Sequence, residues 1–376
     1  MSDTRAKKIL HVVGARPNFM KVAPVMKALS EHPDRLRQVL VHTGQHYDYQ
    51  MSALFFEELE IPEPDYNLGI GSDSHGAQTG RMLIETETIL LKERPGWVFV
   101  YGDTNSALAG ALAAAKLHMP VAHVEAGLRS FDRTMPEEVN RIVTDQVASL
   151  LFTPSRDGDQ NLLHEGISKE KIEFVGNVMI DTLAQALTRE ERLSYTAAPG
   201  TEGLLEQLNG RQYVLTTLHR PSNVDDPRAL SDIVSALGAV SAKVPVIFPV
   251  HPRTQKRMQE MSLREWPSEI RLLEPLGYFD FLALMRKASV VVTDSGGIQE
   301  ETTYLGIPCL TVRPNTERPV TITHGTNALV SSQPEVLLSA IEAALRRGHA
   351  HSPAVPPELW DGRASQRIVD VLLRRN

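Results

Sequence analysis

Short apolar runs alternate along this chain with glycine-rich or polar turns and with stretches of helical periodicity. The runs, such as GWVFVY and VPVIFPV, are rich in Val, Ile and aromatic residues and do not alternate with polar positions. Strands have this composition when helices cover both faces of a parallel sheet. The pattern therefore predicts right-handed βαβ units and the α/β fold class, with doubly wound parallel sheets.

The predicted strands form two groups, separated by the polar segment TREERLSYTAAPGTEGLLEQLNGRQ. A chain of 376 residues is also too long for one small core and fits two domains. We expect two Rossmann-like domains that face each other across a cleft, the first over residues 1–178 and the second beginning at residue 179. The segment RIVDVLLRRN predicts a final amphipathic helix.

Composition and charge narrow the class of protein. The formal net charge of -7 disfavours wholesale attraction to nucleic acid or to an anionic membrane. No stretch is apolar over the roughly 18 residues that a membrane-spanning helix needs. The single cysteine, Cys309, fits a reducing compartment and is expected to be a small core residue. We therefore expect a soluble cytoplasmic protein that binds neither nucleic acid nor membrane.

The residues with the most reactive side chains directly follow the apolar runs. They occur, in chain order, in GARP, TGQH, GDT, EAGLR, LHRPSN, VHPR and DSGG. Loop composition alone would explain the glycines, but not so many histidines and arginines. Because ligands bind outside the carboxyl ends of the strands in open α/β sheets, these loops are the expected site.

The stretch TDSGGIQEE predicts an anion site. Backbone N–H groups of Ser295, Gly296 and Gly297, at the start of a helix, suit a phosphate, and glycine allows close approach. Glu301, next to Glu300, would then bind a ribose diol. The alternatives are a plain tight turn and first-turn carboxylates that only complement the helix dipole, a role expected for one of the two glutamates. Neither G-x-x-x-x-G-K-[ST] nor G-x-G-x-x-G is present, so we expect no nucleotide cofactor.

Three acids gather in the first predicted domain. Asp103 and Glu125 end consecutive apolar runs, and neighbouring parallel strands would bring them to one rim. Glu137 opens the next helix, where glutamates are also common for electrostatic reasons alone. Near a sugar ring, such acids act as general bases or stabilise positive charge.

Basic residues at the strand ends fit a diphosphate. Arg16 and Lys21 follow the first apolar run, and His219 and Arg220 end the first run of the second domain. Arginine offers a fork of donors to phosphate oxygens. His251 stands at another strand end, in PVHPR. Each of these bases, taken alone, fits a solvated surface residue equally well.

Metal binding is not expected from the sequence. It contains no H-E-x-x-H, no C-x-x-C and no spaced aspartate loop. His11, His42 and His123 lie within or at the end of apolar runs, where core residues with satisfied hydrogen bonds are expected.

Eight segments occur in this order: GARPNFMKVAPV, HTGQHYD, VYGDTNSALAGALAA, PVAHVEAGLRS, PEEVNR, PVHPRT, TDSGGIQEE and NTERP. Together they resemble the non-hydrolysing UDP-N-acetylglucosamine 2-epimerase family over nearly the whole chain. HVEAGLRS with DSGGIQEE at this separation is the most specific part. The resemblance implies a glycosyltransferase-B-like fold. In that fold the final helix, within 360–376, returns to complete the first domain and leaves 179–359 to the second.

The resemblance also implies an isomerase that interconverts UDP-N-acetylglucosamine and UDP-N-acetylmannosamine for cell-surface polysaccharide precursors, without a cofactor; we expect it to be a homodimer. UDP would leave C1 to give a 2-acetamidoglucal and add back after C2 is protonated on the opposite face. The catalytic residues expected are Asp103, Glu125, Glu137 and His219. The residues expected to bind the UDP-sugar are Arg16, Lys21, His251, Phe281 by the uracil, Ser295, Gly296, Gly297 and Glu301 by the ribose.

The chain departs from the family pattern in two loops. Many regulated bacterial members have GTRPE and QHRQM where this chain has GARPN and QHYDYQM. The second loop helps those members bind an activating UDP-N-acetylglucosamine, so with Tyr47 and Asp48 we do not expect the same activator site. The changed loops leave room for another 2-acetamido sugar, such as a diacetamido uronate.

Three alternatives stay open at this point. A glycosyltransferase of the same architecture would share the UDP site but need a surface for an acceptor. A hydrolysing epimerase would differ only in letting water reach the glucal. A binding protein with a dead site is disfavoured because the acids and the phosphate-binding residues are intact.

Overall fold

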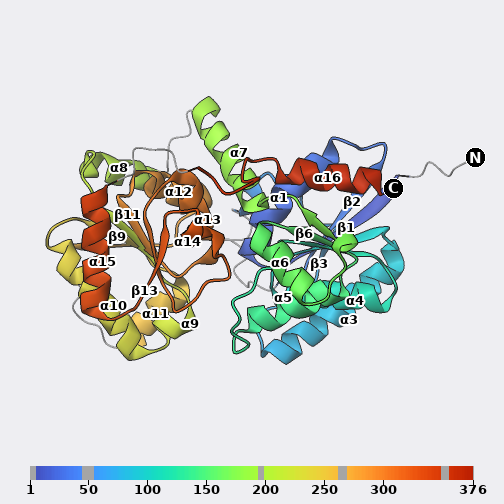
Figure 1. Ribbon diagram of the computed structural model, residues 1–376, viewed down its shortest axis with the longest axis horizontal. Coiled ribbons are helices and arrows are strands. Elements are labelled where there is room, and N and C mark those ends of the chain that lie inside the picture. Colours follow the sequence, from blue (N-terminus) through green and yellow to red (C-terminus); the bar gives the residue numbers. More distant parts are fainter. Residues whose placement is uncertain (1–5, 45–54, 194–198, 261–268, 349–354, 376) are drawn as a thin grey trace, which may run out of the picture. The chain divides into compact units, whose positions relative to one another are not determined.

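The computed structural model describes residues 6–44, 55–193, 199–260, 269–348 and 355–375. The chain forms two compact units, which Figure 1 colours along the sequence. Unit 1 comprises residues 1–185 and 358–376, and unit 2 comprises residues 186–357. Tyr47 and Asp48, which carry the expectation about an activator site, lie outside the described residues.

Unit 1 is built on a parallel sheet with the strand order β3-β2-β1-β4-β5-β6-β7. The strands are β1 (Lys7–Val13), β2 (Leu36–His42), β3 (Tyr66–Asn67), β4 (Trp97–Tyr101), β5 (Val121–Val124), β6 (Leu150–Thr153) and β7 (Ile172–Phe174). The helices are α1 (Arg16–Ser30), α3 (His75–Glu93), α4 (Asn105–Lys116), α5 (Pro136–Val147), α6 (Arg156–His164), the 3-10 helix η1 (Lys169–Lys171), α7 (Val178–Leu193), which leads into unit 2, and α16 (Ala364–Arg374).

Unit 2 repeats the plan with the strand order β10-β9-β8-β11-β12-β13. The strands are β8 (Val214–Thr217), β9 (Val246–Pro249), β10 (Ile270–Leu273), β11 (Val290–Thr293), β12 (Cys309–Val312) and β13 (Asn327–Val330). The helices are α8 (Pro199–Leu208), α9 (Pro221–Val224), α10 (Pro227–Ser241), α11 (Pro252–Glu260), α12 (Tyr278–Lys287), α13 (Gly296–Leu305), α14 (Val320–Thr323) and α15 (Pro334–Arg347). The predicted fold class, two doubly wound parallel α/β domains, is confirmed.

The apolar runs are the central strands, because helices shield both of their faces. Every residue of β4 and of β5 is buried. Small residues let α4 lie close to this sheet: a Cβ added at Gly110 would come within 3.0 Å of Val12 Cγ2 and 3.2 Å of Val100 Cγ1. The alanine-rich sequence of α4 therefore follows from close packing of a helix on β-branched strand residues.

The division between the units falls seven residues later than the sequence predicted, after residue 185 instead of 178, inside α7. The first turns of α7 belong to unit 1 because their polar side chains bond there. Thr182 Oγ1 donates to the Met20 carbonyl at 2.5 Å. Asp181 accepts from the N–H groups of Ala364 at 3.0 Å and Ser365 at 2.6 Å, at the start of α16. Because one continuous helix belongs to both units, the sequence composition does not change at the boundary and does not mark it.

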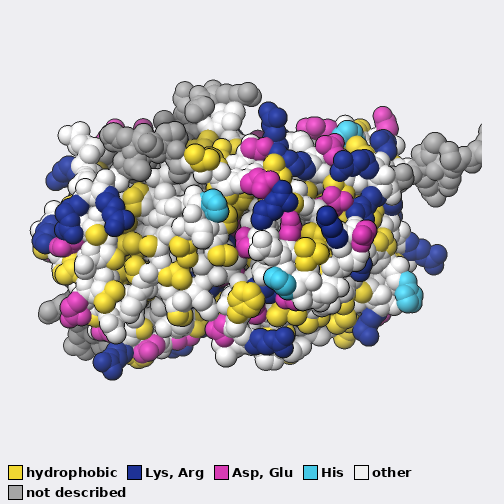
Figure 2. Space-filling view, in the orientation of Figure 1, with side chains coloured by type: hydrophobic (Ala, Val, Ile, Leu, Met, Phe, Trp, Pro, Cys, Tyr) yellow, Lys and Arg dark blue, Asp and Glu magenta, His cyan; other side chains and the backbone are white. Residues whose placement is uncertain are grey.

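Two further expectations concern the core and the surface. Cys309 is buried, as predicted, and burial raises the pKa of its thiol to about 11. None of the helices in the described stretches combines the length and the apolar character needed to cross a bilayer. On the face shown in Figure 2, Lys and Arg side chains lie among Asp and Glu side chains, so this face has no strong field of one sign.

The capping contact of Asp181 yields a stability prediction. Asp181→Ala removes three hydrogen bonds at the start of α16, including the 2.6 Å bond from Ser365 Oγ. We expect a loss of about 2 kcal/mol, which corresponds to a melting temperature roughly 5 °C lower in scanning calorimetry. Asp370→Ala, on the exposed side of the same helix, is the matched control and should melt like the wild type. Equal melting temperatures for both variants would contradict the capping role.

Candidate functional site

Each sheet reverses its strand order beside its first strand, and the predicted site residues follow the strands that flank these reversals. In unit 1 the reversal lies between β1 and β4, and in unit 2 between β8 and β11. Arg16 follows β1 and Asp103 follows β4; His219 follows β8 and Ser295 follows β11. At such a switch point the loops diverge to opposite faces and leave a crevice for a ligand. The topology therefore gives two equivalent candidate positions, one in each unit.

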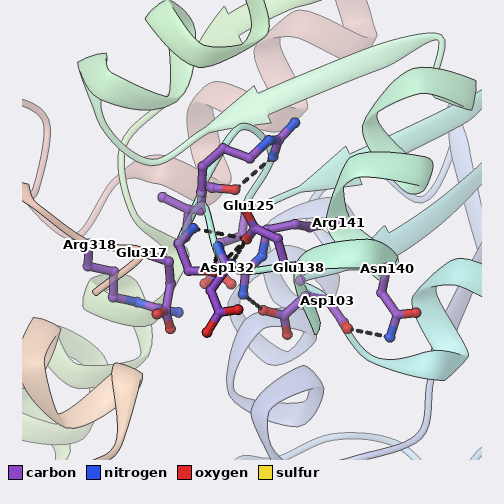
Figure 3. A network of polar contacts seen from close by, with 12 residues as sticks. Asp103, Glu125, Asp132, Glu138, Asn140, Arg141, Glu317 and Arg318 are labelled. Carbon is purple, nitrogen blue, oxygen red and sulfur yellow. Dashed lines mark hydrogen bonds and ion pairs between the residues drawn. The ribbon is translucent and has the colours of Figure 1, made fainter. Parts of the chain in front are cut away.

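A buried arginine fixes Asp103. Arg141, on α5, is 2% exposed and points one nitrogen at Asp103 Oδ2 and the other at Glu138 Oε2, the latter at 2.6 Å (Figure 3). Asn140 Nδ2 also donates to the main-chain carbonyl of Asp103 at 2.9 Å. Asp103 remains about a quarter exposed, so a carboxylate held by a cation still faces outward.

A second carboxylate–cation pair lies at the end of the neighbouring strand. Glu125 follows β5, and its Oε1 accepts from Lys21 Nζ at 2.7 Å. Both side chains are almost fully buried. The sequence predicted Lys21 as a phosphate-binding residue, and the structure instead shows it paired with Glu125. Glycine is favoured at position 102 because its φ is +62°, in the left-handed region, and a Cβ would also lie 2.7 Å from Lys21 Nζ.

The remaining predicted residues of unit 1 are more open. Glu137, near the start of α5, is half-buried, and no hydrogen bond or ion pair of its side chain is present within the described residues. Arg16 is half-buried, and its guanidinium lies 4.5 Å from the ring centre of Phe55. These two side chains therefore differ from Asp103 and Glu125, which buried cations hold in place.

Beneath these residues lies a layer of buried charges. His123 Nδ1 is 2.6 Å from Asp145 Oδ1, and its Nε2 is 2.8 Å from the Gly102 carbonyl. Arg129 bonds to the other oxygen of Asp145 at 2.7 Å and to Glu165 at 2.6 Å. Burial by itself would raise the pKa of Asp145, but the charges of His123 and Arg129 lower it. The layer supports the Gly102–Asp103 turn from below.

The core histidines largely follow the expectation. Both ring nitrogens of His123 and of His11 have partners, and burial lowers the pKa of His11 to about 3. His42 departs from it: the ring packs against Phe19 and Phe56, and its Nε2 has no hydrogen-bond partner within the described stretches. Aromatic packing, instead of a full set of hydrogen bonds, accommodates this histidine.

Asn18 is a site residue that the sequence reasoning missed. Its Oδ1 accepts from the N–H groups of Gly14 at 3.1 Å and Ala15 at 3.2 Å, and its Nδ2 donates to the Tyr101 carbonyl at 2.8 Å. Thr104 Oγ1 is a further donor at 3.2 Å. One buried side chain thus joins the loop after β1 to the loop after β4. The only signal in the sequence is its place in GARPN.

In unit 2, Asp294 organises the loop after β8. Its carboxylate accepts from the N–H groups of His219 at 3.1 Å and Arg220 at 2.9 Å, and from Asn223 Nδ2 at 3.1 Å. It also holds His219 Nδ1 at 2.9 Å, while the histidine side chain is 39% exposed. Burial would raise the pKa of Asp294, but the charge of His219 and these hydrogen bonds lower it. The sequence identified His219 but not the residue that orients it.

The start of α13 is where the sequence predicted an anion site, but the Ser295 N–H, one of the three predicted donors, donates to Thr293 Oγ1 at 3.0 Å. Ser295 is the N-cap residue but makes no capping hydrogen bond with its side chain. The first N–H groups of a helix have no partner within the helix, so they remain available to an anion. Gly296 is needed for packing as well, because a Cβ would lie 2.5 Å from Arg318 Nη1.

Both glutamates of α13 have specific partners, which corrects the expectation that one of them only complements the helix dipole. Glu300 and Glu301 lie in the second turn of α13, beyond the reach of the terminal dipole. Glu300 Oε1 is 2.8 Å from Arg318 Nε, and Glu301 Oε1 accepts from the Tyr278 hydroxyl at 3.0 Å. The first-turn expectation was wrong because the helix already begins at Gly296, four residues before Glu300.

A cluster around Glu317 was also missed. This buried carboxylate bonds to Arg313 Nη2 at 2.7 Å, contacts Arg318, and lies 3.6 Å from Arg220 Nη2. Burial is the main reason that the pKa of Arg313 is lowered. The three arginines come from the loops after β8 and β12, which meet at the same edge of the sheet. The segment NTERP contains Glu317 and Arg318, but the sequence does not show that Glu317 pairs with Arg313 and lies near Arg220.

The last two predicted residues lie at the same edge of unit 2. Phe281, on α12, is 9% exposed and packs largely in the core. His251, just before α11, is exposed, and its ring centre lies 5.7 Å from that of His219. Its Nδ1 accepts from the Arg253 N–H at 3.2 Å. The structure thus brings His251 to His219, and leaves little of the Phe281 ring open to a ligand.

Comparison with known proteins identifies close relatives along the whole chain. The family model described as UDP-N-acetylglucosamine 2-epimerase matches residues 27–373. The chain is 44% identical over 371 residues to the UDP-N-acetylglucosamine 2-epimerase of Methanocaldococcus jannaschii, and the match covers 97% of this chain and 98% of that protein. It is equally 44% identical over 370 residues to the UDP-2,3-diacetamido-2,3-dideoxy-D-glucuronate 2-epimerase of Pseudomonas aeruginosa, covering 98% and 99%.

A solved structure agrees at the level of the fold. The crystal structure of the Methanocaldococcus jannaschii enzyme in complex with UDP-GlcNAc and UDP has a TM-score of 0.88 and 43% sequence identity, and the match covers 98% of this chain and 99% of that one. A Neisseria meningitidis enzyme bound to UDP-GlcNAc matches at a TM-score of 0.85 and 30% identity, covering 98% and 100%.

The buried carboxylate of Asp294 yields a pH-dependent prediction. Its pKa is lower in the folded chain than in the unfolded chain, so its contribution to stability is complete above about pH 4 and is lost as the pH falls through the folded value. Asp294→Asn should therefore cost about 2 kcal/mol in urea unfolding at pH 7, and the deficit should shrink below about pH 4. Asp232→Asn, on α10, is the control. A deficit that stays constant with pH would contradict a role for the charge.

Proposed function

Because this chain belongs to the UDP-N-acetylglucosamine 2-epimerase family, we propose that it interconverts UDP-N-acetylglucosamine and UDP-N-acetylmannosamine by inverting C2, without net hydrolysis. One observation carries this proposal. Asp103 and Glu125 stand at the ends of adjacent strands, each held by a buried cation, Arg141 and Lys21. Two fixed carboxylates at one sheet edge suit proton transfer at a sugar carbon.

The chemistry explains why such a site needs both a nucleotide anchor and carboxylates. The C2 proton of the sugar is not beside a carbonyl, so its direct removal is very costly. If the C1–O bond to UDP breaks first, positive charge at C1 makes that proton removable, and a 2-acetamidoglucal results. Protonation of C2 on the opposite face, with return of the UDP oxygen to C1, gives the epimer. Atoms and charge balance without a cofactor.

Unit 2 carries the groups that suit the nucleotide. The N–H groups of Gly296 and Gly297 at the start of α13, and the partly exposed ring of His219, would donate to the departing diphosphate. Asp294 would keep that ring oriented throughout the reaction. Glu301, with its Tyr278 partner, would bind the ribose. Phe281, the residue expected by the uracil, could offer it only the small part of its ring that is not buried. Arg16, described within unit 1, is a half-buried cation of the kind that suits a phosphate oxygen.

Unit 1 carries the groups that suit the sugar. Two neighbouring carboxylates repel each other and would tend to take up a proton. Arg141 and Lys21 hold the two carboxylates in place, where they could accept a proton or stabilise the cationic C1. Glu137, which is half-buried and has no buried cation beside it within the described residues, is the third proposed acid. Buried ion pairs of this kind are costly to assemble, which favours a catalytic reason for them.

A diacetamido uronate nucleotide is the second candidate substrate. The observation that favours it is the 44% identity to the Pseudomonas aeruginosa epimerase, the same value as for the Methanocaldococcus jannaschii enzyme. The reaction at C2 would be the same, and the sugar would add a carboxylate. The ratio of kcat/KM for the two UDP-sugars distinguishes these candidates.

Proton NMR in deuterated water tests the reaction itself. Purified protein with UDP-N-acetylglucosamine, without NAD or metal, should incorporate deuterium at C2 and produce UDP-N-acetylmannosamine. Release of free N-acetylmannosamine and UDP would identify a hydrolysing enzyme instead. If UDP-N-acetylglucosamine gives an unchanged spectrum and the diacetamido uronate nucleotide exchanges its C2 proton, the diacetamido uronate nucleotide is the substrate.

Substitutions separate the two proposed roles. Glu301→Ala should weaken UDP binding about tenfold in isothermal titration calorimetry, because a buried acceptor is lost. Asp103→Asn and Glu125→Gln should leave UDP affinity unchanged and lower turnover at least about 100-fold. Glu335→Ala, on the exposed face of α15, is the control for both measurements. Full turnover in the Asp103 and Glu125 variants would remove the catalytic assignment.

A further inference from the structure

Phe131 is an aromatic residue that the structure holds in the open. It lies in the loop between Glu125 and α5, and its side chain is 80% exposed. Its φ angle is +59°, in the left-handed region that bulky residues avoid. Exposure alone needs no explanation, but an exposed aromatic in an unfavourable backbone conformation does.

The unfavourable conformation is part of a pattern in this loop. Glu125 has φ +75° and Gly127 has φ +82°, so three left-handed residues occur within the seven positions from Glu125 to Phe131. Arg94, for comparison, is left-handed at the C-terminal end of α3, where such a residue ends a helix in the ordinary way. Strain that surrounding structure maintains is concentrated at ligand-binding and catalytic sites.

Specific bonds keep Phe131 in this conformation. Its N–H donates to Glu138 Oε1 at 2.8 Å, and the N–H and Oγ of Ser130 both donate to Glu138 Oε2 at 2.9 Å. Glu138 is 1% exposed and is itself held by Arg141 at 2.6 Å. The loop is therefore fixed, and its aromatic side chain is presented outward from a rigid base.

The same base fixes the candidate catalytic acid. The second nitrogen of Arg141 contacts Asp103, so one arginine sets the position of Asp103 and, through Glu138, of Phe131 (Figure 3 shows Asp103, Glu138 and Arg141). Buried contacts thus link the main chain at Phe131 to the carboxylate of Asp103. The sequence indicates no role for this phenylalanine, because only the φ angle and the exposure distinguish it.

We propose that Phe131 is a substrate-contacting residue whose ring packs on the apolar face of the 2-acetamido sugar and determines affinity for the sugar part of the nucleotide-sugar. This inference rests on the proposed function. The sugar is the occupant that fits, because the acids tied to Phe131 are those proposed to act at the sugar, whereas the nucleotide contacts are proposed in unit 2. Aromatic rings are common in small-molecule sites and bind through their faces.

The test compares ligands with and without the sugar. Phe131→Ala should lower the apparent affinity for UDP-N-acetylglucosamine about tenfold in calorimetry, and raise KM by a similar factor, while affinity for UDP stays unchanged. Phe131→Gly should show the same loss for the UDP-sugar without a lower melting temperature, because glycine accepts positive φ freely. A residue kept only for structure would lower the melting temperature instead. Val139→Ala, another exposed apolar residue on α5, is the matched control.

Two results would overturn the proposal for Phe131. One is unchanged affinity for the UDP-sugar in both variants. The other is a change of oligomeric state in sedimentation analysis, which would assign the ring to a contact between copies of the chain. Failure of the proposed function looks different: the wild type would bind UDP-N-acetylglucosamine without exchanging its C2 proton, and the tenfold dependence on Phe131 would persist.

Discussion

The reversal of strand order beside the first strand of each sheet is the constraint on which the rest of this structure depends. Parallel strands end at one edge, and where the order reverses, the connecting segments leave in opposite directions. The loops after β1 and β4, and those after β8 and β11, therefore surround an open position in each unit. A single topological rule brings together residues from distant parts of the sequence.

Within that frame, each of three proposed site residues is held by a buried partner of complementary chemistry. Arg141 holds Asp103, Lys21 holds Glu125, and Asp294 holds His219. In two of the pairs, Asp103 and His219 stay partly exposed while their partners are enclosed, whereas both members of the Lys21–Glu125 pair are buried. Such pairs contribute little net stability once the cost of desolvation is counted, so their value lies in orientation and in the control of protonation.

The sequence anticipated the fold and the places of the site residues better than their partners. Unbroken apolar runs predicted the parallel strands. Arg16, Asp103, His219 and Ser295 follow the strands at the switch points, while Glu125 and His251 follow the strands next to them, β5 and β9. It did not indicate that Lys21 faces Glu125, that Glu300 faces Arg318, or that the unit boundary lies inside α7. Each of these depends on which long side chain reaches which neighbour across the fold.

What the sequence alone determined is therefore whatever depends on local order: strands, turns, and the chemistry that directly follows each strand. Hydrophobic periodicity and glycine at tight turns act over a few residues, so they can be recognised in the sequence. The tertiary structure alone decided the ion pairs, the hub formed by Asn18, and the exposed, strained ring of Phe131. These features depend on which side chains meet in the folded chain, because Coulomb attraction and burial depend on distance in space and not on separation along the sequence.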